Sequence, residues 1–205
     1  MPFHSVDFSL PTTTTLFTHS FCPFAHKVQL ALKLSNFDYD TIEVDLYGNS
    51  KPKELVTGQV PVFVVNQQLL TESEDILDYI QTNDMVFNDI NLDKRKWYKN
   101  IMSSNLLPAG KKAVLRRSTS DMFDVLKEIE EYHSSSLSSS SSINFLASKD
   151  LPSITDCSVF PFLYRIDSEF GINESEYPSL SRWLKEMLNM TQVRETIPNS
   201  WWWWW

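Results

Sequence analysis

A strand-like stretch that runs directly into a proline-initiated helix constrains the fold of this chain more than any other feature. Residues 13–18 are mostly β-branched or aromatic, which favours a strand. Pro23 suits the first position of a helix, because its missing N–H would have no partner there. Apolar residues then recur at helical spacing from Phe24 onward, so the helix has a face to bury. The chain therefore contains a strand–turn–helix unit with Cys22 at its junction.

The place of Cys22 beside a helix N-terminus favours a reactive thiol. Unpaired N–H groups and the positive end of the helix dipole stabilise a thiolate there. Such settings lower the thiol pKa from about 8.5 to between roughly 3.5 and 7.5, so we expect a nucleophile or redox thiol. The alternative is a small buried core cysteine. His26, one helical turn later, either assists Cys22 as imidazolium or is a plain helix residue, whereas Cys157 is expected to be buried and inert.

Four further segments extend this unit into an α/β domain. Residues 41–45 alternate apolar and polar side chains, which predicts a half-buried strand and completes a βαβ unit with a right-handed crossover. Residues 62–65 and 69–70 predict two more strands. The acidic stretch 71–75, followed by apolar residues at helical spacing, marks the start of a second helix.

Beyond a polar, acidic linker at residues 83–92 the strand signals stop. Apolar residues then recur at helical spacing in four stretches, namely 93–107, 121–132, 157–166 and 178–188. Residues 108–110, Pro-Ala-Gly, are expected to break the first of these helices. Ser153 and Asp156 form a predicted capping box before the third. We therefore expect residues 93–205 to form an all-helical domain.

Two stretches do not fit a packed helix. Residues 134–142 are serine except for Leu137, and such a run buries too little apolar surface to stay ordered, so we expect a flexible loop. Residues 201–205 are five consecutive tryptophans. These side chains cannot all face inward, and an exposed apolar patch of this kind usually marks a partner, a pocket or an aggregation hazard.

Charge and cysteine content exclude several classes of protein. The net charge of −8, without basic clusters, argues against nucleic-acid binding. Two cysteines cannot build a disulfide framework, and the histidines show no metal-ligand spacing, so no metal is expected. No apolar run approaches the roughly 20 residues of a membrane span. Without a secretory signal pattern, we expect a cytoplasmic protein.

The motif around Cys22 resembles a known family. Residues 20–27, Ser-Phe-Cys-Pro-Phe-Ala-His-Lys, resemble the active-site start of the cysteine-type glutathione transferases of the omega and lambda classes, and also glutaredoxins. Residues 156–165 resemble the sixth helix of omega-class enzymes, with a proline and flanking aromatics at the same offsets. The resemblance implies a glutathione-transferase fold: a thioredoxin-like βαβ-ββα domain at 1–82, a linker, and an all-α domain.

The resemblance also implies a site. Cys22 would be catalytic and glutathione the co-substrate, because in this family a cysteine forms a covalent bond where other classes place serine or tyrosine. The Val60–Pro61 bond would be cis, which leaves the Val60 backbone free to pair with glutathione. The implied glutathione-binding residues are Phe24, Lys51, Val60, Pro61, Glu72 and Ser73.

Two parts of glutathione have implied partners within this set. Glu72 and Ser73 would hold the γ-glutamyl end, because a helix N-terminus binds a carboxylate and a nearby carboxylate binds an ammonium group. Lys51 would contact the glycine carboxylate, with Lys53 as its rival.

The implied function is a glutathione-dependent thiol transferase or reductase. It would act on small oxidised or glutathionylated substrates, in deglutathionylation or dehydroascorbate-type reduction. A non-enzymatic binding or scaffold module is the alternative, and conjugation of glutathione to electrophiles is a third. Three aromatic residues would line an acceptor site or, more simply, pack in the core: Trp97, Tyr98 and Tyr164. A homodimer and a partner for the tryptophan tail stay open.

Overall fold

The first half of the molecule is a small sheet with two helices. The computed structural model describes residues 11, 13–46, 58–84, 86–87, 91–116, 118–135 and 145–199. Its first elements are β1 (Thr15–Thr18), α1 (Pro23–Leu34), β2 (Asp40–Glu43), β3 (Val62–Val65), β4 (Gln68–Leu70) and α2 (Ser73–Asn83). This order confirms the predicted βαβ-ββα arrangement.

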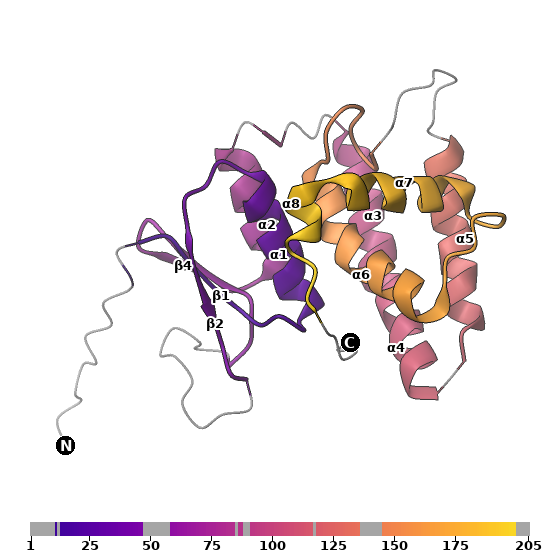
Figure 1. Ribbon diagram of the computed structural model, residues 1–205, viewed down its shortest axis with the longest axis horizontal. Helices are drawn as coiled ribbons and strands as arrows, with labels where there is room; N and C mark the ends of the chain where they lie inside the picture. Colours follow the sequence, from indigo (N-terminus) through magenta and orange to yellow (C-terminus); the bar gives the residue numbers. More distant parts are fainter. Residues whose placement is uncertain are drawn as a thin grey trace.

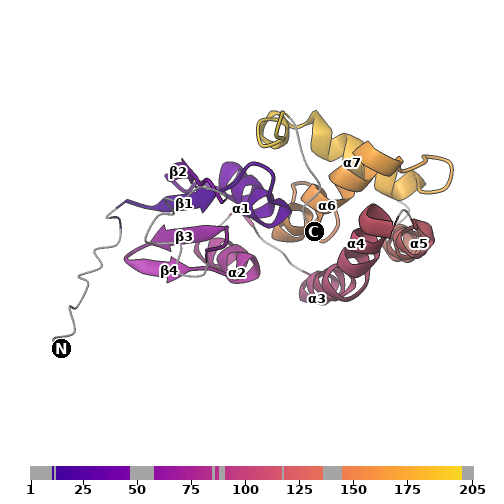
Figure 2. The ribbon, with the colours of Figure 1, turned by 90° about the horizontal axis from the view of Figure 1, so that it is seen from below.

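The four strands form one mixed sheet in the order β2-β1-β3-β4. β1 runs parallel to β2, with Leu16 beside Thr41, and antiparallel to β3. β4 pairs antiparallel with β3 through the tight turn at Asn66 and Gln67, both of which have positive φ. Helices α1 and α2 lie between this sheet and the helical half of the molecule (Figure 2).

The expectation of a half-buried β2 is wrong. All four of its residues are exposed, including Ile42 at 41%. β2 is an edge strand, and burial begins only after it ends, at Val44. The alternating pattern therefore located the strand but not its exposure.

The second half is helical (Figure 1). Its elements are α3 (Leu92–Ile101), the π-helical turn η1 (Met102–Leu106), α4 (Leu107–Arg116), α5 (Ser120–Ser135), α6 (Ile154–Phe170), α7 (Pro178–Asn189) and the short α8 (Thr191–Arg194). α6 packs against α1 and thereby joins the two halves. α6 is longer at both ends than predicted.

Pro108 does not break the helix as predicted. The chain continues from α3 through η1 into α4, with Pro108 in the first turn of α4. A proline inside a helix lacks an N–H and crowds the preceding turn. Here the wider π-turn precedes it, with the Leu107 N–H bonded to the Met102 carbonyl, so the helix passes the proline without ending.

Two buried carboxylates fix the helical half. Asp156 and Ser153 form the predicted capping box at the start of α6. Glu130, a buried residue of α5, accepts hydrogen bonds from the backbone N–H groups of Ser179 and Leu180 at 2.9 and 2.8 Å. Glu130 therefore caps α7 from another helix, which local sequence could not indicate.

Several predictions fall wholly or partly outside the described residues. Ser134 and Ser135 belong to α5, and the rest of the predicted serine loop lies outside the description, as does the tryptophan tail. The domain boundaries near residues 82 and 93 stay predictions. Within the described ranges, no helix is long and apolar enough to cross a membrane.

Candidate functional site

Cys22 lies at the start of α1, as predicted. It is the N-cap residue, and its carbonyl accepts the first helical hydrogen bond, from His26 N–H at 2.9 Å. Its backbone N–H bonds the His19 carbonyl, also at 2.9 Å, which closes the turn from β1. The side chain is partly buried, and its thiol points to the Val60 carbonyl, with Sγ 3.7 Å from the oxygen.

The predicted lowering of the Cys22 pKa is wrong. Burial raises the pKa of this thiol and outweighs the groups that favour the thiolate. Those groups are the backbone N–H donors of Ala25 and Phe24 and the cations of Arg165 and Lys27. The helix N-terminus does act on the sulfur as expected, but desolvation is the larger effect.

The Val60–Pro61 bond is cis, as predicted. It precedes β3, and it places the Val60 carbonyl against the Cys22 thiol. Two segments 38 residues apart in the chain thus meet at the sulfur.

The start of α2 lies where the sequence indicated. Ser73 is its first residue and is 8% exposed, while Glu72 is the exposed N-cap and makes no side-chain capping bond. The next residue, Glu74, forms an ion pair with buried Lys27 and accepts a hydrogen bond from Ser158 at 3.0 Å. The first turn of α2 is thereby tied to both α1 and α6.

Phe24 and the three candidate acceptor-site aromatics lie in packed surroundings. Phe24 meets Phe162 of α6 edge to face, with ring centroids 5.4 Å apart. Trp97 stacks on Tyr132, with ring centroids 3.7 Å apart, and Tyr164 stacks on Phe160. Tyr98 is only 1% exposed. These contacts support core packing for the three aromatics. Lys51 and Lys53 lie outside the described residues.

His26 cannot assist Cys22 as imidazolium. Burial lowers the pKa of its ring to about 3, with a further contribution from the Arg165 charge, so the ring is neutral at physiological pH. Its two nitrogens lie 3.1 Å from Arg165 and 3.0 Å from Thr196 Oγ1. His26 is therefore a link between α1, α6 and the C-terminal segment.

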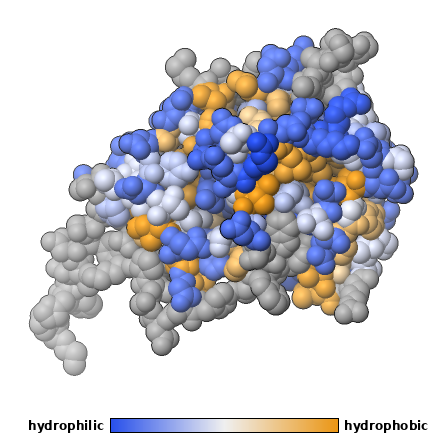
Figure 3. Space-filling model, viewed as in Figure 1, coloured by the Kyte–Doolittle hydropathy of each residue, from blue (hydrophilic) through white to orange (hydrophobic). Residues whose placement is uncertain are grey.

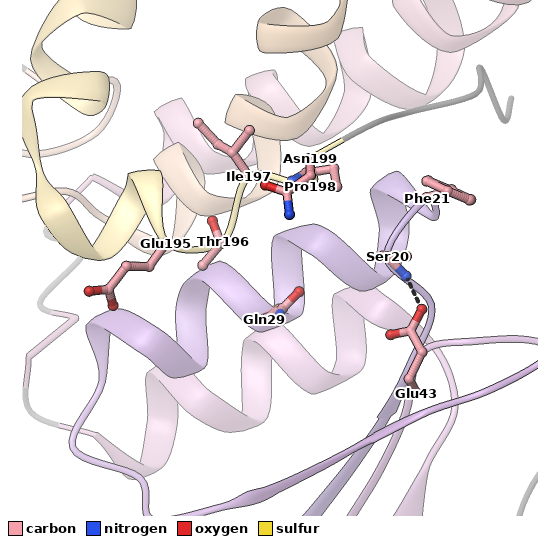
Figure 4. A pocket seen from close by; sticks show the side chains of 9 residues that line it. All are labelled: Ser20, Phe21, Gln29, Glu43, Glu195, Thr196, Ile197, Pro198 and Asn199. Carbon is pink, nitrogen blue, oxygen red and sulfur yellow. Dashed lines mark hydrogen bonds between the residues drawn. The ribbon is translucent and has the colours of Figure 1, made fainter.

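A hollow of about 390 Å³ lies beside the Cys22 turn (Figure 4). Ser20 and Phe21 of the turn form one wall, and the segment after α8, from Glu195 to Asn199, forms the other. On the Ser20 side, the Ser20 N–H donates to Glu43 at 2.7 Å. Figure 3 shows hydrophobic residues near the middle of this face, where the C-terminal segment crosses, with hydrophilic residues around them.

Known proteins resemble this chain along most of its length. Residues 16–85 match the family described as glutathione S-transferase, N-terminal domain. Glutathione S-transferase U3 from Arabidopsis thaliana is 30% identical over 200 residues, which cover 86% of this chain and 85% of the relative. Glutathione S-transferase U2 from the same plant is 31% identical over 192 residues, 86% of this chain and 84% of the relative.

The chain belongs to the glutathione S-transferases.

Solved structures share the fold of this transferase. A tau class glutathione S-transferase from mango, Mangifera indica, has a TM-score of 0.74 at 17% identity and covers 93% of this chain and 94% of its own. Glutathione transferase Omega 3C from Trametes versicolor has a TM-score of 0.73 at 14% identity, over 93% and 91%. At these identities the structures show the fold alone. The relatives that match this chain at 30–31% identity carry no omega or lambda name, and the omega-class structure matches at 14% identity only. The omega or lambda class predicted from the cysteine motif is therefore not shown.

The sequence did not indicate one charged residue that lies near the Cys22 thiol. Arg165 is 1% exposed within an otherwise apolar stretch of α6, and its charge acts on the Cys22 thiol. A charged residue on the buried face of a predicted core helix is rare unless it is paired. An arginine within the apolar stretch of this helix was therefore the sequence feature that could have indicated a buried, functional charge.

Proposed function

We propose that this transferase conjugates glutathione to electrophilic compounds, with Cys22 at the place where the glutathione sulfur reacts. One observation carries the proposal: the Cys22 sulfur is held as a thiol, because burial raises its pKa and its S–H points to the Val60 carbonyl. A thiol is a hydrogen-bond donor, so it can turn to the sulfur of a bound glutathione thiolate. The full-length relatives named glutathione S-transferases support the same reaction.

The chemistry needs only an activated sulfur. The glutathione thiolate attacks an electrophilic carbon, a carbon–sulfur bond forms, and the leaving group departs with the bonding electron pair. Cys22 donates to the sulfur before attack and returns to its bond with Val60 afterwards. Backbone N–H groups at the start of α1 add donors at the same place.

We assign glutathione to the surface beside Cys22, the Val60–Pro61 bond and the start of α2. The Val60 backbone would pair with the peptide, as an added strand does. Ser73 and Glu72 would hold the γ-glutamyl carboxylate and ammonium groups at the N-terminus of α2. Lys51 stays the proposed partner of the glycine carboxylate, while Pro61 and Phe24 would contact the bound peptide.

A second candidate is thiol transfer of the omega and lambda type, and the sulfur at position 22 favours it. The Cys22 thiolate would attack the glutathionyl sulfur of a mixed disulfide, forming a Cys22–glutathione disulfide and releasing the other thiol. A second glutathione thiolate would then attack that disulfide, giving oxidised glutathione and free Cys22. The N–H groups of Phe24 and Ala25 would stabilise the thiolate that both steps require.

Cys22→Ser separates the two candidates. A hydroxyl keeps the donor, so conjugation to a chlorodinitrobenzene should persist or rise, whereas reduction of the mercaptoethanol–glutathione disulfide should vanish. Cys157→Ala removes the other thiol and serves as the control. Loss of conjugation in Cys22→Ser with thiol transfer present in the parent would support the second candidate. Glutathione binding without either reaction in the parent would instead support a binding module.

A further inference from the structure

A buried arginine lies between the helix that carries Cys22 and the helical half. Arg165 of α6 is 1% exposed. Its Nη1 donates to the Pro161 carbonyl at 2.7 Å and to His26 Nδ1 at 3.1 Å. Its Nε and Nη2 are buried without a hydrogen-bond partner among the described residues. The Nη1 side of the guanidinium is therefore held by hydrogen bonds, whereas its Nε and Nη2 groups could still donate to another group.

The hydrogen bonds around His26 run in one direction. Because the ring is neutral and Nδ1 accepts from Arg165, the proton is on Nε2, which donates to Thr196 Oγ1 at 3.0 Å. The Thr196 hydroxyl in turn donates to the Val193 carbonyl at 2.8 Å. Each donor and acceptor in this series is thus assigned. The neutral His26 ring orients Arg165 by accepting its hydrogen bond and does not neutralise its charge.

Among the residues that the structure describes, no carboxylate forms an ion pair with this cation. On α1, Lys27 is paired with Glu74 of α2, and on the exposed side Lys33 is paired with Glu195 after α8. A buried charge is costly unless an opposite charge or hydrogen bonds compensate it. An anion near Arg165 would supply that compensation.

Cys22 is the group placed to become that anion. It is the N-cap residue of α1 and precedes His26 by four residues, which places the two residues on the same side of the helix. The Cys22 sulfur and the Arg165 charge act on each other. Burial raises the thiol pKa and the arginine charge opposes this rise, while burial lowers the Arg165 pKa to about 10 and the thiolate opposes that fall. Arg165 is too deeply buried to touch a substrate, so its effect reaches the reaction through the sulfur.

We propose that Arg165 is a positioning residue that stabilises the thiolate of Cys22 from the buried side, with His26 and Thr196 fixing its orientation. The proposal deepens the second candidate function and rests on it for its use in catalysis, since mixed-disulfide formation consumes this thiolate. The thiolate equilibrium itself can be measured without any glutathione chemistry.

The test is the pH dependence of Cys22 alkylation by iodoacetamide in the free, full-length protein, with peptide mapping of the label. Arg165→Met should move the titration midpoint of Cys22 to higher pH and lower labelling at pH 7 about tenfold, which corresponds to about one pKa unit. Arg165→Lys keeps the charge and should restore most of the rate. Arg182→Met, at an exposed position of α7, should change nothing.

Two further comparisons between variants allow the alkylation experiment to support or overturn the proposal. Arg165→Gln removes the charge but keeps a polar side chain, and it replaces Arg165→Met if that variant does not fold. Identical pH profiles in the parent and a folded neutral variant would overturn the proposal, as would equal losses in the Lys and Gln variants. Because the assay contains neither glutathione nor acceptor, failure of the proposed function would leave this result unaffected.

Discussion

Asp156 of α6 accepts a hydrogen bond from the indole N–H of Trp183 in α7 at 2.7 Å. The same oxygen accepts the Leu146 backbone N–H at 2.9 Å, and the other oxygen accepts the N–H and hydroxyl of Ser153. Asp156 is fully buried. One carboxylate thus joins the start of α6, the segment before it and α7.

Asp156→Asn should destabilise the protein. The amide that replaces one oxygen cannot accept, so at least one buried donor loses its partner, at a cost of about 1–3 kcal/mol. The free energy of unfolding in urea would show the loss, and Asp150→Asn at an exposed position is the control. A change within error in both variants would mean that the cluster contributes little to stability.

His26→Gln should reduce the loss of unfolding free energy that the protein undergoes as the pH falls from 7 to 4. The folded pKa of His26, about 3, lies below its ordinary 6.5, so the unfolded chain binds the proton first. The stability that this neutral ring contributes is present above pH 6.5 and is lost as the pH falls toward 3. Each unit of that difference corresponds to about 1.4 kcal/mol.

Urea unfolding of parent and His26→Gln between pH 7 and pH 4 measures this slope. His133, whose pKa burial lowers to about 4, acts in the same direction in both proteins. Asp156 acts oppositely, because burial raises its pKa to about 6 from 3.8. The contributions of His133 and Asp156 are the same in both proteins, so they cancel when the two free energies of unfolding are subtracted. Curves of unfolding free energy against pH that run parallel for the parent and His26→Gln would contradict the lowered pKa of His26.

Glu74→Gln should destabilise the contact between α1 and α2. It leaves the charge of Lys27 buried without its partner, and the loss should be on the order of 3 kcal/mol. Burial already lowers the Lys27 pKa despite the ion pair. Glu128→Gln, exposed on α5, is the control. Lys27→Met in the Glu74→Gln background should recover part of the loss, and no recovery would point to a role for Glu74 other than charge compensation.

Ser73→Ala should weaken glutathione binding. The proposed site loses one charge-assisted hydrogen bond to the γ-glutamyl carboxylate, worth about 1.5–3 kcal/mol. Isothermal titration of parent and variant gives the two dissociation constants, with Ser134→Ala on α5 as the control. Equal constants for Ser73→Ala and parent would place the γ-glutamyl group elsewhere.

Local sequence patterns predicted the elements that carry the site. Pro23, the apolar spacing after it and the Val60–Pro61 pair all act over a few residues, so they could be interpreted without a structure. The capping box of Ser153 and Asp156 is local for the same reason. The predicted helix break at Pro108 was wrong because a π-turn, which has no simple sequence signature, lets the helix continue past this proline.

The electrostatics of the site could not be predicted in the same way. The Cys22 pKa depends on how deeply tertiary packing buries the sulfur, and that burial overcame the local effect of the helix N-terminus. The pairing of His26 with Arg165 joins residues 139 positions apart. Only the packing of α6 on α1 brings these groups together.

The packing of α1 has a consequence for how the protein unfolds. This one helix contacts α2 of the sheet half and also α6 and α8 of the helical half. Its buried residues therefore cannot be exposed to water without opening both halves. Melting should follow a single cooperative transition when tryptophan fluorescence and far-ultraviolet circular dichroism are compared, and a fragment that ends after α2 should expose the α6-facing side of α1 and self-associate.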